Sequence, residues 1–189
     1  SGNNSHAEGY LTVALGANSH AEGVDTEAGA SNAHAEGAST KALGGASHAE
    51  GAGTETSGDF AHAEGQGTKA IGQASHAEGA GAEAKGVYSH AGGEGTIAKG
   101  YAQTAIGVFN VEQGTEGAKA ATDHALIIGN GTDEARANAL AVKWNGDTDI
   151  AGDMNITSGK KYKINGTALA ASDVGAVATT DIVNTLTET

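Results

Sequence analysis

The sequence predicts an all-β protein, a parallel β-solenoid built from coils of 14 residues. One observation is a strict repeat. His-Ala-Glu-Gly begins at His6, His20, His34, His48, His62 and His76, and His-Ala-Gly-Gly at His90. Each 14-mer also contains two similar halves in which side chains alternate before a glycine, which is strand periodicity ended by a corner. Finally, the 31 glycines disfavour the alternative, a helix of two heptads per repeat, because each costs about 1 kcal/mol in a helix interior.

The two halves of a repeat predict two short strands per coil. The first half reads Ser-His-Ala-Glu-Gly, as at residues 5–9, and the second reads Thr-x-Ala-x-Gly, as at residues 40–44. In a strand the central alanine must face away from the flanking histidine and glutamate. Alanines of the two halves then face each other across a flat coil, and such coils stack about 4.8 Å apart. The period and the missing Asp pattern exclude a calcium-binding nonapeptide roll.

The thin core predicts association with other copies of the chain. Aromatic residues make up 4% of the sequence, so alanine-filled coils bury too little apolar surface to offset the ordering of the chain. One outer face is nearly uniform, whereas the equivalent positions of the other half vary, for example Val13, Glu27 and Lys41. Uniformity indicates a repeated contact, so we expect the uniform face at an oligomer interface, as an interchain His/Glu ladder. The ladder comprises His6, Glu8, His20, Glu22, His34, Glu36, His48, Glu50, His62, Glu64, His76, Glu78 and His90.

The paired halves resemble the head repeats of trimeric autotransporter adhesins, the YadA-like head. Residues 104–107 (Thr-Ala-Ile-Gly) and 124–129 (His-Ala-Leu-Ile-Ile-Gly) are closest to the S-V-A-I-G pattern of that family. The resemblance covers residues 3–131. It implies a left-handed β-roll and a homotrimer of three rolls about one axis. The sequence departs from the family in placing histidine and glutamate where apolar residues are usual.

The repeat stops after Gly107, and the rest of the chain has a different pattern. A polar insertion covers residues 109–122 and precedes an apolar run. Alternating segments around Asn-Gly pairs predict β-hairpins at residues 139–150 and 161–169. Apolar residues at helical spacing near the end predict the start of a helix or coiled coil at residues 179–189. We therefore expect a roll followed by a β-rich shaft region at residues 132–178.

This C-terminal region is similar to phage tail-fibre and prophage structural proteins. The matching stretches are 128–132, 139–146, 162–166 and 173–176. The similarity implies a structural and receptor-binding segment of a trimeric phage or phage-like tail fibre, located in the virion or outside the cell, which attaches to a host-surface glycan or protein. The alternatives are the head of a bacterial trimeric autotransporter adhesin, or a tailspike whose glycan hydrolase lies elsewhere in a longer protein.

Charge and composition limit the other functions. The net charge of −13 disfavours nucleic acid, and no apolar stretch reaches the length of a membrane span. The chain has no cysteine, which removes thiolate chemistry. A catalytic centre copied in every coil is implausible, so we predict no enzyme and no cofactor. In the loop after the first hairpin strand, Asp147, Asp149 and Asp153 are better interpreted as polar loop residues than as a calcium site.

The histidines allow two interpretations of the ladder. In the preferred one, each histidine bonds a glutamate of a neighbouring chain, which should raise the histidine pKa and lower that of the glutamate. In the weaker one, a metal ion or anion lies on the three-fold axis, because imidazole is a ligand for Zn, Ni and Fe. Its candidates are His6, His20, His34, His48, His62, His76 and His90. The stability of an ion-pair ladder should peak in mildly acidic conditions, whereas acid should destabilise a metal-bound one through the histidine range.

Overall fold

The computed structural model describes residues 2–153, 163–164 and 167–168. All regular elements in these residues are strands, and the chain divides into two compact units, Ser1–Gly152 and Asp153–Thr189. Among the described residues, no helix has the length and apolarity needed to cross a membrane. The all-β prediction is therefore confirmed for the part of the chain that the structure describes.

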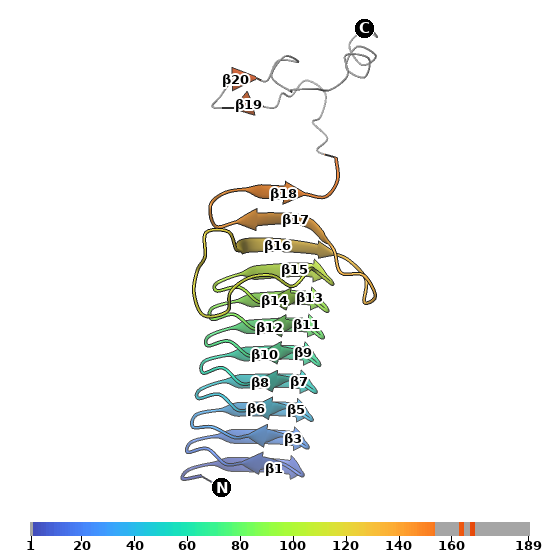
Figure 1. The fold of residues 1–189 in the computed structure, drawn as a ribbon. Helices are drawn as coiled ribbons and strands as arrows, with labels where there is room; N and C mark the ends of the chain where they lie inside the picture. The colour runs from blue at the N-terminus through green and yellow to red at the C-terminus, as the bar shows by residue number, and fades with distance from the viewer. Residues whose placement is uncertain (1, 154–162, 165–166, 169–189) are drawn as a thin grey trace. The chain divides into compact units, whose positions relative to one another are not determined.

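The first unit is a parallel β-solenoid of about seven coils, as the repeat predicts (Figure 1). The longer strands are β1 (His6–Tyr10), β3 (His20–Val24), β5 (His34–Ala38), β7 (His48–Ala52), β9 (His62–Gln66), β11 (His76–Ala80), β13 (His90–Glu94) and β15 (Thr104–Val108). The shorter strands are β2 (Val13–Ala14), β4 (Glu27–Ala28), β6 (Lys41–Ala42), β8 (Glu55–Thr56), β10 (Lys69–Ala70), β12 (Glu83–Ala84) and β14 (Ile97–Ala98). Each set forms its own sheet, and every residue pairs with its equivalent in the next coil, as His48 does with His62.

The core between the two sheets consists of small side chains. Ala49 of a longer strand and Ala42 of a shorter one are fully buried, as the alternation predicts. Threonines at the start of the second half, such as Thr40 and Thr54, are buried beside them. With mainly alanine, threonine and serine between the sheets, the coil is flat, and its burial per residue is small.

The glycines have two different physical roles. Gly51 ends a longer strand with φ of +107°, and a Cβ there would collide with the backbone of Gly65 in the next coil. Gly58, in the second half, has no positive φ, but its Cβ would collide with the backbone of Gly72. The expected positive φ thus applies to the first-half glycines. At most second-half glycines the stacked backbones leave little room for a side chain, and alanine, the smallest one, occupies the equivalent position at Ala30.

Two buried amide side chains end the sheet of short strands. In most coils the backbone N–H at the first short-strand position donates to a threonine carbonyl of the next coil, as Glu55 does to Thr68. At β14, Ile97 N–H donates instead to Asn110 Oδ1 at 2.7 Å, and Asn110 Nδ2 donates to Ile97 O at 2.9 Å. Gln103 Oε1 likewise accepts from Lys99 N–H at 2.9 Å. Both amides are fully buried, and they replace the backbone of a short strand that the next coil lacks.

The sheet of longer strands continues beyond the repeats. After an excursion, β16 (His124–Asn130) pairs in parallel with β15, with Ala105 opposite Ile127. Then β17 (Asn138–Lys143) and β18 (Thr148–Ile150) add antiparallel strands to the same sheet. The predicted hairpin at 139–150 is confirmed, and it belongs to the same compact unit as the repeats rather than to a separate one.

The second unit contains one described hairpin. Strands β19 (Lys163–Ile164) and β20 (Thr167–Ala168) pair antiparallel, which agrees with the hairpin predicted at 161–169. The helix or coiled coil predicted at residues 179–189 lies outside the described residues.

Candidate functional site

Imidazole rings form a continuous stack along the outer face of the longer strands. From His20 to His90, consecutive ring centroids lie 4.7–5.0 Å apart and the ring planes differ by no more than 7°. Only the first pair, His6 and His20, is tilted, at 57°. The stack follows directly from the in-register parallel pairing, which places identical side chains at the same point of every coil.

Glutamates form a second column beside the histidines, and the two columns contact each other within one chain. His48 Nε2 lies 3.2 Å from Glu36 Oε1, and His90 Nε2 lies 3.2 Å from Glu78 Oε1, in each case in the preceding coil. The corresponding distances are 3.6 Å from His62 to Glu50 and 3.5 Å from His76 to Glu64. His48 and His90 thus hydrogen-bond a glutamate of their own chain, whereas His62 and His76 have a glutamate close by without a hydrogen bond to Nε2. The interchain pairing expected from the sequence stays a prediction.

In the single chain, the pKa of two members of the stack is lowered rather than raised, and the rise expected for interchain pairing stays a prediction. Burial lowers the pKa of His34, and the neighbouring His48 lowers it further. Burial also lowers the pKa of His62, between His48 and His76. The sequence argument counted the carboxylates but not the desolvation of a stacked ring or the repulsion of its equivalent rings. The single chain therefore favours neutral imidazole at these positions.

The carboxylates alternate in their affinity for protons. Hydrogen bonding with Glu36 raises the pKa of Glu22, and hydrogen bonding with Glu64 raises the pKa of Glu50. Hydrogen bonding with Glu50 lowers the pKa of Glu64 despite burial. Like charges directly opposite each other in a sheet repel. The pKa values of neighbouring carboxyl groups in the column are therefore shifted in opposite directions.

The two columns create groups of metal-ligand atoms and an open groove. In four groups, all ligand atoms lie within 4.8 Å of one another: His6, Glu8 and His20; His34, Glu36 and His48; Glu50, His62 and Glu64; Glu64, His76 and Glu78. The Nε2 atoms of His34, His62 and His76 are inaccessible to solvent and have no hydrogen-bond partner. The groove lies along the glutamate column of the first three coils and is lined by Glu8, Gly9, Glu22, Gly23, Glu36 and Gly37.

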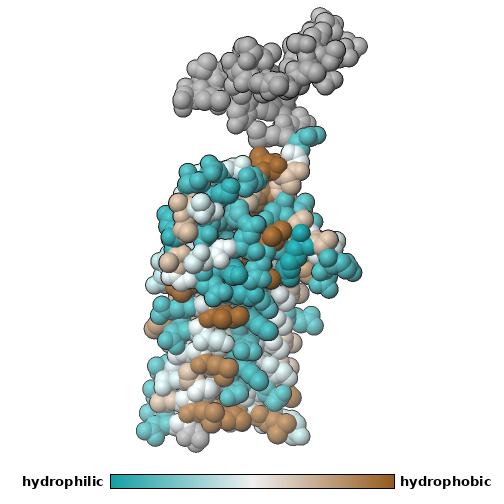
Figure 2. Space-filling view, viewed as in Figure 1, coloured by the Kyte–Doolittle hydropathy of each residue, from teal (hydrophilic) through white to brown (hydrophobic). Residues whose placement is uncertain are grey.

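The outer face of the short strands is different in character. Leu15, Leu43 and Ile71 are exposed two coils apart, and Figure 2 shows brown apolar bands separated by paler and teal residues up the solenoid. Leu43 leans over Gly29 of the preceding coil, where little space remains for a Cβ. The apolar residues thus alternate with small or polar ones and do not merge into one patch.

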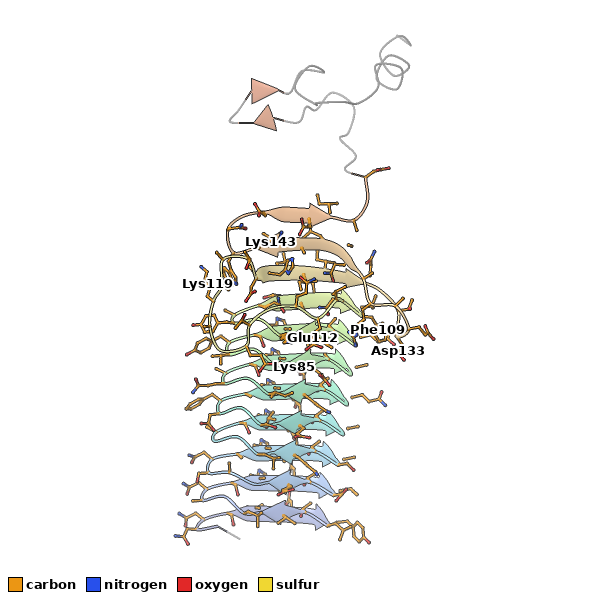
Figure 3. The ribbon with its side chains drawn as sticks, viewed as in Figure 1. Lys85, Phe109, Glu112, Lys119, Asp133 and Lys143 are labelled. Carbon is orange, nitrogen blue, oxygen red and sulfur yellow. The ribbon has the colours of Figure 1, made fainter. Side chains whose placement is uncertain are left out.

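The polar insertion covers the upper part of this second face. Glu112 Oε1 lies 3.2 Å from Lys85 Nζ and 3.5 Å from Lys99 Nζ, which joins the insertion to two coils (Figure 3). Backbone bonds from Val87 and Tyr101 to residues of the insertion add to this attachment. Two lysines in adjacent coils would repel each other, and Glu112 neutralises that repulsion.

One corner of the solenoid carries exposed aromatic side chains. Phe60 and Tyr88 occupy equivalent positions two coils apart, with 66% and 54% of their surface exposed. Both have φ of +60°, an uncommon backbone conformation for a bulky residue. Tyr101 lies edge-on to Tyr88, with ring centroids 5.5 Å apart. Exposed aromatic rings on a fixed backbone form a surface suited to binding.

A smaller pocket lies beside the hairpin of β17 and β18. It is lined by Gln113, His124, Asn138, Ala141, Lys143, Asp149, Ile150 and Ala151. Asp149 Oδ2 lies 3.3 Å from Lys143 Nζ and 3.8 Å from the mostly buried His124 Nε2. Asp147 instead accepts a hydrogen bond from Asn145 in the turn. Asp147 and Asp149 thus have polar or cationic partners, and among the described residues neither they nor Asp153 belong to a group that could hold a metal ion.

Sequence analysis missed the amides that end the short sheet, Gln103 and Asn110, and the insertion contact at Glu112. These residues appear once each, so the repeat gave no sign of them. Their signal was the break in the period after Gly107. Comparison of the chain with protein-family models and with curated proteins finds no match.

Proposed function

We propose that this chain is a structural and receptor-binding segment of a trimeric phage or phage-like tail fibre that attaches to a host-surface glycan or protein. The uniform face of stacked histidines and glutamates carries the proposal. Between a third and two fifths of each side chain from Glu36 to Glu64 and from His48 to His76 is exposed. A second and a third copy would cover a face that repeats unchanged from coil to coil.

The thin core supports the assembly. Burial contributes about 25 cal/mol per Å² of apolar surface, and an alanine contributes little of it. A solenoid whose core is mainly alanine, threonine and serine has few large side chains to offset the loss of conformational entropy. Packing of three solenoids along the uniform face would supply the missing burial and would exclude water from the His/Glu columns.

The aromatic corner is the surface that we assign to attachment. Phe60 and Tyr88 lie in the turns before β9 and β13, outside the strands that carry the His/Glu columns, so we expect them to stay accessible in a trimer. Tyrosine combines an apolar ring with a polar group, which suits both glycans and proteins. The same argument holds for the alternative, an adhesin head, because both classes present such a surface from a rigid rod.

The assembly is tested by matched substitutions on the two faces. Glu50→Trp places a bulky ring on the uniform face, and Glu55→Trp places the same ring on the face of the short strands. Sedimentation analysis at micromolar concentration should show a trimer for the unchanged chain and for Glu55→Trp, and a loss of trimer for Glu50→Trp. A folded monomer for the unchanged chain would refute the proposal.

Attachment is tested separately, by binding of the purified chain to host-cell surfaces and to arrayed glycans. The variants Phe60→Ala and Tyr88→Ala should lose binding while their sedimentation stays unchanged. Leu43→Ala, which removes an exposed apolar side chain from another face, is the control and should bind normally. Equal binding by all variants would exclude the aromatic corner as the attachment surface.

A further inference from the structure

We propose that the His/Glu columns form an array of sites for divalent transition-metal ions such as Zn²⁺. Each ion would be held by histidine Nε2 and glutamate carboxylate oxygens from adjacent coils of the same chain. This inference does not depend on the fibre function. It also differs from an ion on a three-fold axis, because one chain supplies all the protein ligands.

The ligand atoms are already close enough for one ion. Zn–N and Zn–O bonds of about 2.0–2.2 Å place the ligands of one ion no more than about 4.4 Å apart. In the group of Glu64, His76 and Glu78, the three ligand atoms lie within 4.8 Å of one another. The carboxylates are partly exposed, so small side-chain rotations close the remaining distance. Three protein ligands and open positions for water are a common zinc arrangement.

The nitrogen atoms point to a ligand that the protein does not supply. The Nε2 atoms of His34, His62 and His76 have no accessible surface and no hydrogen-bond partner. His76 Nε2 nevertheless lies only 3.5 Å from Glu64 Oε1. Buried polar atoms are rarely left unpaired, because their desolvation costs about 1–3 kcal/mol. A metal ion between the imidazole and the carboxylates would satisfy all of these atoms together.

The electrostatics of the two columns favour binding of a metal ion over protonation of the histidines. A protonated stack would place positive charges 4.7–5.0 Å apart along the face from His20 to His90, where they would repel one another. Neutral imidazole is the form that binds metal ions. The glutamate column needs positive charge, because its carboxylates lie opposite one another in register. Mixed imidazole and carboxylate ligands suit Zn²⁺ and its transition-metal neighbours better than Mg²⁺.

The arrangement also sets the number of ions. Two of the four groups share Glu64, so three groups can be filled without a shared ligand. When Glu64 serves the group with His76 and Glu78, the three filled groups begin at His6, His34 and Glu64, in alternate coils. Neighbouring ions then lie two coils apart, which limits their repulsion. We therefore expect about three ions per chain at saturation, the first of them, at His6, Glu8 and His20, being the most exposed.

The test uses the full chain without an affinity tag. After treatment with EDTA and dialysis, the chain is titrated with ZnCl₂ by calorimetry, and zinc that remains after gel filtration is counted by mass spectrometry. Zinc should bind at about three ions per chain and raise the melting temperature in proportion to its concentration. MgCl₂ should not replace it. Failure of the unchanged chain to retain zinc would overturn the proposal.

Matched variants assign the ligands. Glu36→Gln with Glu64→Gln removes two carboxylates from the columns, and Glu27→Gln with Glu55→Gln makes the same charge change on the opposite face. The double variant on the His/Glu columns should lose most of the retained zinc, and the double variant on the opposite face should keep it. Equal loss in both pairs would show a general response to net charge and would overturn the array.

A third variant, His34→Gln with His62→Gln and His76→Gln, isolates the nitrogen ligands. The number of zinc ions retained by this variant should fall from about three per chain toward one, the ion held by His6, Glu8 and His20. Full retention of zinc in this variant would overturn the array. Circular dichroism of each variant establishes that it is folded before metal is counted. Trimer formation is measured in the same samples, so failure of metal binding and failure of the fibre proposal are distinguishable.

Discussion

Replacement of Asn110 by leucine tests the end of the short sheet most directly. The change keeps the side-chain size but removes the bonds to Ile97 N–H and Ile97 O, which measure 2.7 and 2.9 Å. Asn110 is fully buried, and Ile97 is 7% exposed, so water cannot easily replace the lost partners. Each unpaired backbone group costs about 1–3 kcal/mol.

The added apolar burial of leucine opposes this cost and contributes about 1.5–3 kcal/mol. With the midpoints of these ranges, the cost of two unpaired backbone groups exceeds the gain from one buried leucine by about 2 kcal/mol, so the free energy of unfolding falls by that amount. For a unit of this size, 1 kcal/mol corresponds to about 2–4 °C, so the melting temperature should fall by about 4–8 °C.

Thermal and urea unfolding followed by circular dichroism measure the effect. Gln66→Leu, at an exposed amide on β9, is the control and should change stability by no more than about 0.5 kcal/mol. If Asn110→Leu is no less stable than Gln66→Leu, the amide does not replace the missing strand, and our account of this end of the solenoid is refuted.

Two further predictions concern the glycines and the histidines. Gly51→Ala should prevent stable folding or lower the urea midpoint strongly, because Gly51 has positive φ and its Cβ would meet the next coil. Gly53→Ala should cost only about 1 kcal/mol, because its φ of +67° is strained for alanine but nothing lies within 4 Å. Similar midpoints for the two variants would contradict the close-approach role. In EDTA, melting temperature should fall as pH drops below about 6.5, because burial lowers the pKa of His34 and His62 and the unfolded chain then binds more protons. His34→Gln with His62→Gln should flatten that slope, and an unchanged slope would exclude these two groups as its source.

The repeated part of the fold was readable from the sequence because one local pattern is copied in every coil. Strand alternation placed Ala49 inside and His48 and Glu50 outside, and the constant period fixed which residues stack. The Asn-Gly pairs located both hairpins for the same reason, since turn chemistry is local. No long-range information was needed for any of these assignments.

The ionisation of the ladder required the tertiary structure. The sequence shows that histidine and glutamate lie two positions apart, but not that His62 Nε2 loses solvent and lies between two equivalent rings. The desolvation of a ring depends on every neighbour around it, and that is a property of the packed coils. For this reason the sequence could not reveal that the pKa of His34 and His62 is lowered in the single chain.

The end of the solenoid was likewise decided only in three dimensions. Asn110 and Gln103 bond to backbone atoms of the preceding coil that a missing strand would otherwise bond, and Glu112 bridges two lysines in separate coils. None of these residues repeats, so no period marks them. A repeat in a sequence determines which residues stack, whereas a single buried amide reveals its role only when the backbone groups that it satisfies are in place around it.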